Sequence, residues 1–311
     1  MSAKGESKVA VVAAIVGNLL VAVSKFVAAY FTGSSAMVSE GIHSLVDTGN
    51  GGLVLLGMRR SGKAADAEHQ FGHGMELYFW TLIVAISIFG IGGGVSVYEG
   101  VLHVLHPVET GNPLINYAVL AIAFVIEGSS FLVAWREFTK ARGTVPAVEF
   151  IRTSKDPSLF TIVFEDSAAM LGLIVAFLGV LLGRVTGIPQ FDGGASVLIG
   201  LILMCVAWIL ARETKGLLIG EGVEPAVLAE MRALVAADAG VARVGEIRTM
   251  YLGPADLLVN LDVAFREGLG HAEVSDAIQR VESALRAAQP EISRVYIEAQ
   301  SLQNALDAER P

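Results

Sequence analysis

Six long apolar stretches constrain the fold of this chain more than any other feature of its sequence. A helix needs about 20 apolar residues to cross a hydrocarbon core of about 30 Å, and each stretch is long enough. The stretches cover residues 9–32, 35–57, 76–101, 113–135, 159–183 and 192–211. Only 17% of the 311 residues are charged, whereas soluble domains carry roughly 25%. The sequence therefore predicts a membrane α-helical protein with a six-helix transmembrane bundle over residues 1–213.

Basic residues are concentrated at alternate ends of these spans. They occur at the N-terminus and after the second, fourth and sixth spans, as Lys4, Lys8, Arg59, Arg60, Lys63, Arg136, Lys140, Arg142, Arg152, Lys155, Arg212 and Lys215. The loops at the opposite ends contain only Arg184. Because Lys and Arg favour the cytoplasmic side, both termini are expected there. The first stretch is long and lacks an early small-residue cleavage pattern, which favours a true span over a signal peptide. We expect a multi-pass protein of a bacterial inner membrane.

A more polar segment, residues 214–311, follows the last span. Two stretches with helical periodicity and three with strand-like alternation follow one another in the order αββαβ. This order is typical of a small two-layer domain with both helices on one face of the sheet. The net charge of −9 gives no indication of nucleic-acid binding.

Ionisable residues inside the apolar stretches are the strongest functional signal. His43 and Asp47 lie four residues apart in the second stretch, and Glu165 and Asp166 are adjacent in the fifth. Such groups cost roughly 2.5–3.5 kcal/mol each on insertion scales, so they usually serve an ion or a transport pathway. One imidazole and several carboxylates on facing helices predict a divalent-metal site. The alternative for His43 and Asp47 is a hydrogen bond that satisfies two buried polar groups.

A second cluster of metal-binding residue types lies in the loop between the second and third spans. His69 and His73 are four residues apart, and Asp66 precedes them. The alternative is that the "FGHG" segment is a structural turn whose histidines cap the third span. The two interpretations are compatible with each other.

The motifs "SSAMVSEGIHSLVDTGN", "EHQFGHGMELYFW" and "FDGGASVLIGLIL", together with the αββαβ tail, resemble the cation diffusion facilitator family. The segment "FIRTSKDPSLFTIVFEDSAAMLG" is similar to the branch of zinc transporter nine. The resemblance implies a six-helix transport unit, a ferredoxin-like cytoplasmic domain and a homodimer. It also implies export of zinc from the cytoplasm in exchange for protons, and a further metal at Asp66, His69 and His73.

The resemblance also implies that His43, Asp47 and Asp166 bind the transported ion. The family usually has another ligand four residues before Asp166, where this chain has Ile162. Glu165 is the obvious substitute, although neighbours on a helix point about 100° apart. Glu127, Glu40 or a water molecule are the alternatives.

Zinc is the expected cargo, and no other cofactor is expected. A site with more oxygen ligands would also suit manganese, iron or cobalt. An intramembrane metalloenzyme is disfavoured because the chain has no HExxH motif. A membrane metal sensor or scaffold that has lost transport remains an alternative because of Ile162. His271 is the one histidine in residues 214–311, so we expect this segment to mediate dimerisation without binding metal.

Three further features have ordinary structural explanations. The segment "FGIGGGVSVYEG" in the third span favours close helix packing. Asp192 begins the sixth span, where an acidic residue is favourable at a helix N-terminus. Lys25 in the first span is expected to line the cavity, to extend towards the membrane surface, or to pair with a buried acid.

Overall fold

The computed structural model describes residues 3–108 and 112–300, and side chains within residues 17–108 and 112–299. Lys4 and Lys8, which the orientation argument used, have no described side chains, and residues 301–311 lie outside the described part. The elements are α1 (Ala3–Thr32), α2 (Ser35–Ser61), α3 (Glu76–Ser87), η1 (Ile88–Gly94), α4 (Val95–Leu105), α5 (Pro113–Arg142), α6 (Ala147–Thr153), α7 (Pro157–Thr186), α8 (Gln190–Ile219), α9 (Pro225–Ala236), β1 (Val241–Gly253), β2 (Asp256–Phe265), α10 (His271–Ala288) and β3 (Ile292–Gln300).

Contacts between residues divide the chain into a helical unit and a sheet-containing unit. The helical unit comprises residues 1–59 and 77–215, and the sheet unit comprises residues 60–76 and 216–311. The loop after α2 therefore groups with the C-terminal residues. The domain bounds expected from the sequence, 1–213 and 214–311, stay predictions.

Four helices of the described chain are long and apolar enough to cross a membrane. They are Glu76–Leu105, Pro113–Arg142, Pro157–Thr186 and Gln190–Ile219. The described part of α1, Gly17–Thr32, is apolar but shorter. Helix α2 is not among the four, and its sequence contains Glu40, His43 and Asp47 besides several Ser and Gly residues. The count of six spans therefore stays a prediction.

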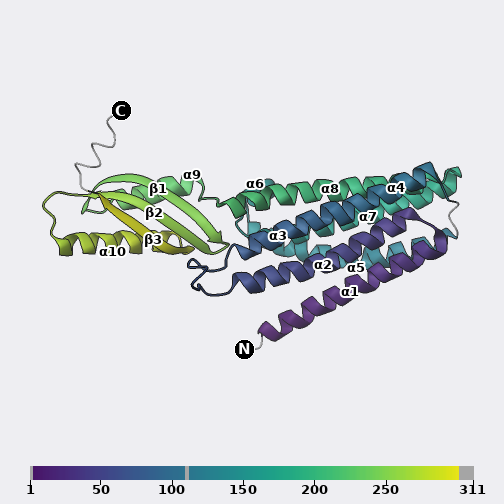
Figure 1. Ribbon diagram of the computed structural model, residues 1–311, viewed down its shortest axis with the longest axis horizontal. Coiled ribbons are helices and arrows are strands. Elements are labelled where there is room, and N and C mark those ends of the chain that lie inside the picture. The colour runs from purple at the N-terminus through teal and green to yellow at the C-terminus, as the bar shows by residue number, and fades with distance from the viewer. Residues whose placement is uncertain (1–2, 109–111, 301–311) are drawn as a thin grey trace. The chain divides into compact units, whose positions relative to one another are not determined.

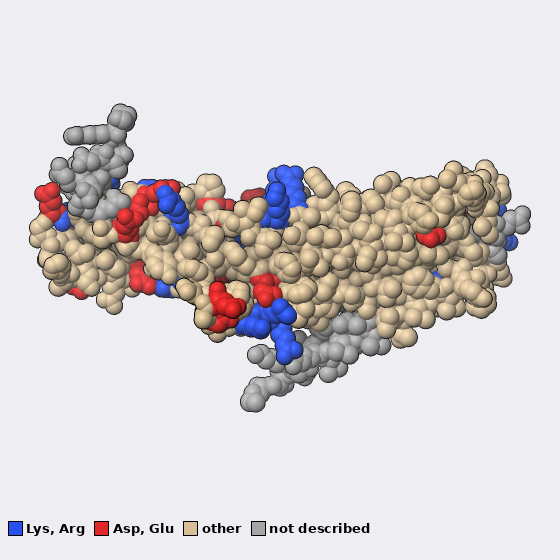
Figure 2. All heavy atoms as spheres, in the orientation of Figure 1, with Lys and Arg blue, Asp and Glu red and all other residues tan. Residues whose placement is uncertain are grey.

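The surface of the helical unit is apolar, as contact with lipid requires. Large side chains such as Leu20, Val125 and Trp208 are well exposed. Figure 2 shows few Lys, Arg, Asp or Glu side chains along most of the visible face of these helices. A soluble protein rarely exposes so extensive an apolar surface. The protein is therefore an integral membrane protein.

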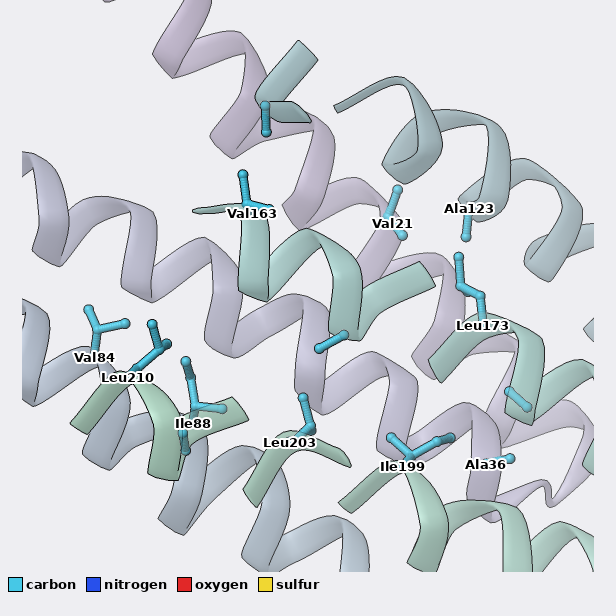
Figure 3. Close-up of a cluster of buried hydrophobic side chains, with 14 of the residues drawn as sticks. Val21, Ala36, Val84, Ile88, Ala123, Val163, Leu173, Ile199, Leu203 and Leu210 are labelled. Atoms are coloured by element: carbon cyan, nitrogen blue, oxygen red, sulfur yellow. The ribbon is translucent and has the colours of Figure 1, made fainter. Parts of the chain in front are cut away.

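The helices of this unit run side by side (Figure 1) and share one apolar core. Figure 3 shows side chains from several helices meeting there, among them Val21, Val84, Leu173 and Leu203. Within this core, a π-helical turn, η1, joins α3 to α4.

Glycine residues allow α8 to pack closely against the consecutive helical segments η1 and α4. A Cβ atom at Gly93 would overlap Met204 and lie 3.0 Å from the carbonyl oxygen of Gly200. One heptad further along, a Cβ at Gly193 would lie 2.9 Å from the carbonyl oxygen of Gly100. Small residues that allow backbones to approach are typical of membrane helix packing. The close packing expected of the glycine-rich segment agrees with these contacts.

Asp192 of α8 caps the N-terminus of α2. Its carboxylate accepts hydrogen bonds from the Ser34 hydroxyl at 2.5 Å, from the Ser35 amide at 2.5 Å and from the Ala36 amide at 3.3 Å. Gly33 makes the preceding turn with a φ of 68°, a conformation that favours glycine. A side chain from another helix therefore satisfies the free amides at the start of α2, which fixes that end of α2 against α8.

The sheet unit has its elements in the order α9, β1, β2, α10, β3. β2 is the central strand, antiparallel to β1 and parallel to β3. Alternate residues of β2 from Leu257 to Val263 are buried, and they form one core with Met231 of α9 and Val281 of α10. Both helices therefore cover the same face of the sheet.

The loop between α2 and α3 packs on this sheet. The Arg294 guanidinium of β3 donates to the Phe71 carbonyl at 3.1 Å and lies 5.6 Å from the centre of the Phe71 ring. Gly74 lies so close to the Leu252 carbonyl that a Cβ would overlap it. Four candidate membrane helices separate this loop from the C-terminal strands. An even number of crossings returns the chain to the side where it began, in agreement with these contacts.

Candidate metal sites

One face of α2 carries the first candidate ligands. His43 is buried, and its Nδ1 lies 3.4 Å from Oδ1 of Asp47, one turn further along. The two side chains lie close together, as their spacing on one helix predicts. His43 Nε2 and Asp47 Oδ1 are nevertheless buried without a hydrogen-bond partner among the described residues. Buried polar atoms are normally satisfied, so these two are available to an ion.

Glu165 of α7 faces the same helix. Its Oε1 accepts a hydrogen bond of 2.8 Å from the Asn50 side-chain amide. Asn50 follows Asp47 by three residues and therefore lies on the same side of α2. Glu165 is buried, and the residue that it contacts lies one helical turn from Asp47.

Asp166 has a different partner. Its Oδ2 accepts a hydrogen bond of 3.2 Å from the Ser130 hydroxyl of α5. Ile162, which precedes it by one turn, is 42% exposed. An apolar side chain therefore occupies the position where the family resemblance leads one to expect a ligand.

The two acids considered as alternative ligands are both bound to Lys25. The Lys25 ammonium donates to Oε2 of Glu40 at 2.8 Å and to Oε1 of Glu127 at 2.7 Å. It also donates to the Ser44 hydroxyl at 2.8 Å. The pairing of Lys25 with a buried acid agrees with one of the roles considered from the sequence. Glu40 and Glu127, the alternative ligands, thus already have a cationic partner.

The loop cluster is the more compact of the two sites. Asp66, His69 and His73 each offer one ligand atom, and these three atoms lie within 4.8 Å of one another. Among the described residues, this is the group of His, Cys, Asp and Glu side chains that is close enough to hold one metal ion. The Asp66 carboxylate reaches His73 Nε2 at 2.9 Å and His69 Nδ1 at 3.4 Å. Among the residues that the structure describes, those around the His43–Asp47 pair do not form such a group.

The backbone of the loop orders the Asp66 carboxylate. Its Oδ1 accepts the amides of His69 at 2.7 Å and Glu68 at 3.0 Å. The His69 amide and then the His73 side chain stabilise the ionised form, which holds the pKa of Asp66 well below its ordinary value. The turn expected for this segment is therefore present together with the clustered ligands. Two imidazoles and one carboxylate are a donor set that suits zinc.

The C-terminal residues with metal-binding side chains have other roles. His271 begins α10, and the Glu273 carboxylate accepts the Gly270 amide at 2.7 Å as part of the helix cap. Glu246 pairs with Arg248 at 2.5 Å. Among the described residues these side chains do not assemble into a metal cluster.

Sequence reasoning missed the contacts that three side chains make around the membrane site. Asn50 and Ser130 hold the two acids of α7, and Asp192 fixes the start of α2. Spacing could have found Asn50, because it lies three residues after Asp47. The partners of Ser130 and Asp192 come from distant helices, and local pattern carries no signal for them.

Comparison with known proteins identifies the family. Residues 11–219 match the protein family described as "Cation efflux transmembrane domain". The human protein "Proton-coupled zinc antiporter SLC30A9, mitochondrial" is 35% identical over 265 residues, which are 84% of this chain and 46% of that protein. "Metal tolerance protein C4" of Arabidopsis thaliana is 29% identical, over 83% of this chain and 57% of that protein. This chain therefore spans about half the length of these relatives.

A bacterial relative matches over more of its own length. "Manganese efflux system protein MneP" of Bacillus subtilis is 25% identical, over 88% of this chain and 91% of that protein. The family match covers well over half of the chain, and its limits coincide with the helical region that carries the His43–Asp47 pair. The chain therefore belongs to the cation efflux family, the cation diffusion facilitators, and is similar within it to the branch of zinc transporter nine.

Proposed function

We propose that this protein exports a divalent metal ion, zinc, from the cytoplasm in exchange for protons. The observation that carries the proposal is the pair of unsatisfied atoms on α2, His43 Nε2 and Asp47 Oδ1, buried in an apolar helical unit. The name of the human relative supports zinc and proton coupling. The name of the bacterial relative supports manganese at lower identity, so zinc is the first choice.

The chemistry of the ligands accounts for proton coupling. Imidazole and carboxylate bind a metal only when deprotonated, so metal and protons compete for the same atoms. Binding from the cytoplasm releases protons, and rearrangement of the helices exposes the ion to the opposite side. Reprotonation there lowers the affinity and favours release.

We assign three ligands to the transported ion, namely His43, Asp47 and Asp166. Glu165 is the fourth, reached when it leaves Asn50, because it already faces α2 one turn from Asp47. Its long side chain can bridge that distance, whereas Ile162 offers no donor atom. This set combines one nitrogen with several oxygens, which zinc accepts.

The loop cluster binds a second zinc ion in this proposal. Asp66, His69 and His73 supply three ligand atoms, and solvent supplies the fourth. The site belongs to the sheet unit and lies outside the membrane, so its ion is bound separately from the transported one.

The finer architecture is also part of the proposal. We infer six membrane spans, a ferredoxin-like C-terminal domain and a homodimer, with both termini in the cytoplasm of a bacterium. The order of elements in the sheet unit supports the ferredoxin-like fold, and the loop that packs on the sheet supports a common side for loop and tail. Fractionation of cells and cysteine labelling of loop positions test the location and the orientation.

Transport by the purified protein in liposomes tests the function. Vesicles loaded with a zinc-sensitive dye should show zinc movement when a pH gradient is imposed, and none without protein. Asp47→Ala should abolish this flux. Manganese, cobalt and iron, added at the same concentration as zinc, should reduce the zinc flux only weakly. An unchanged flux in Asp47→Ala contradicts the site. Zinc binding without any flux in the wild type favours a sensor or scaffold.

A further inference from the structure

Lys25 is a fully enclosed charge in the helical unit. Its side chain is 0% exposed, and its ammonium has three hydrogen-bond partners at 2.7–2.8 Å. Two of these partners are the carboxylates of Glu40 and Glu127. An ammonium has three hydrogen atoms to donate, so this arrangement satisfies it completely. One lysine thus neutralises part of a buried acidic cluster next to the proposed metal site.

Glu127 lies between the two sides of the metal site. Its Oε1 accepts from the Ser44 hydroxyl at 3.3 Å, and Ser44 is adjacent to His43. Ser130 follows Glu127 by one turn of α5 and binds Asp166. The second carboxylate oxygen of Glu127, Oε2, is buried without a hydrogen-bond partner among the described residues. Glu127 therefore lies close to the ligands with one oxygen unused.

Glu40 projects in a different direction. Its Oε1 is also buried without a hydrogen-bond partner among the described residues, but it lies against Gly172 of α7, where an added Cβ would overlap it. Gly172 lies nearly two turns beyond Asp166 along α7. Glu40 is therefore accommodated beside the α7 backbone, away from the Asp166 end of the site.

We propose that Lys25 is a positioning residue that keeps the Glu127 carboxylate off the transported ion and thereby sets metal preference. This inference rests on the proposed function. While Lys25 holds Glu127, the ion meets one imidazole and the acids of α2 and α7. Release of Glu127 adds a further carboxylate to this set. Oxygen-rich sites suit manganese relative to zinc, so the preference for zinc falls.

A pair of double variants isolates this role. Lys25→Met with Glu40→Gln removes the cation and leaves Glu127 without its partner. Lys25→Met with Glu127→Gln removes the same cation and leaves Glu40. Both variants keep one net negative charge in the cluster, as in the wild type, and each changes one Lys and one Glu. They differ only in which carboxylate remains.

Competition between zinc and manganese for the purified full-length protein is the readout. Every protein compared, including the reference with Lys25, also carries His69→Ala and His73→Ala. The measured affinities then come from the membrane site alone. In the variant that retains Glu127, the zinc-to-manganese affinity ratio should fall by about 10- to 100-fold, the range for groups that position metal ligands. In the variant that retains Glu40, the ratio should stay within about twofold of the wild type, because Glu40 does not add an oxygen ligand.

Equal zinc-to-manganese affinity ratios in the two double variants would overturn the inference. This holds whether both ratios fall or both remain at the wild-type value. A purely structural role of Lys25 would affect both alike. Glu127→Gln in the presence of Lys25 provides a milder test should the double variants fail to fold. Its ratio should match the wild type, and a changed ratio means that Glu127 already binds the ion.

The proposed function is judged separately, by zinc flux in liposomes. A wild type that binds zinc in the membrane but does not move it contradicts export and leaves the comparison of ratios valid. A wild type that binds no zinc there contradicts both proposals.

Discussion

The two candidate metal sites are built in opposite ways. Asp66, His69 and His73 lie within eight consecutive residues and share one ordered turn. The residues around His43 and Asp47 come from α2, α5 and α7, and their ligand atoms do not converge to the same extent. The first site is held by its own backbone, and the second depends on how three helices are placed.

This difference suits two different tasks. A cluster ordered within one loop does not depend on the positions of several helices, so it favours retention of an ion. Ligands on separate helices can be brought together or separated by movement of the helices, as alternating access requires. We therefore expect the two sites to respond differently to matched substitutions.

Histidine replacement in each site should give the largest contrast. His43→Ala should lower zinc flux in liposomes by more than about 100-fold, because it removes a ligand and not merely a group behind one. His73→Ala should leave most of the flux, because the loop ion is separate from the transported one. Equal losses in the two variants would mean that both sites belong to one transport path.

The two acids of α7 should differ by a smaller amount. Asp166→Asn should reduce zinc flux more than Glu165→Gln, because Asp166 is one of the three assigned ligands, whereas Glu165 reaches the ion only when it leaves Asn50. We expect a difference of about tenfold in the initial rate. The opposite order would make Glu165 the principal ligand of α7 and Asp166 a partner of Ser130 alone.

The number of bound ions tests the loop site directly. His69→Ala should lose one zinc ion per chain in equilibrium dialysis and keep the ion of the membrane site. Glu68→Gln is the matched control, since that residue binds Asp66 through its backbone amide, which the substitution keeps. Loss of zinc in the control, or none in His69→Ala, would contradict the loop site.

The pH dependence of the loop should be the smallest effect. Because the folded pKa of Asp66 is depressed, its stabilising contact is present above the unfolded value of about 3.9 and is lost only as pH falls through the lower folded value. With chelator present, protection factors of the Glu68 and His69 amides should be similar at pH 6 and pH 4. Asp66→Ala should lose this protection at both. Fading of protection in the wild type between pH 6 and pH 4 would contradict the ordering of Asp66.

Sequence reasoning reached part of this organisation. The apolar stretches follow directly from the length of a membrane-crossing helix, and four of them meet that criterion in the structure. The order of elements in the tail could be read from periodicity. The count of spans could not be secured in the same way, because α2 carries the acids, the histidine and the glycines that lower its hydropathy.

The candidate ligands were found because each is costly in a lipid environment, but their partners were not. Lys25 could have paired with either of two acids, and the structure pairs it with both. Asp192 was expected to stabilise the N-terminus of its own helix, whereas its carboxylate caps the N-terminus of α2. These partners depend on the rotation and depth of whole helices, which spacing within one segment does not define.

The sequence by itself determined which segments are apolar enough for lipid and which ionisable groups they carry. It also determined the local pairs, such as His43 with Asp47, because a period of 3.6 residues places every fourth side chain on one face. The tertiary structure decided which buried acids already have a partner and which atoms remain for an ion. That choice rests on how whole helices are placed against one another, since a shift of one turn between α2 and α7 would separate Glu165 from Asn50.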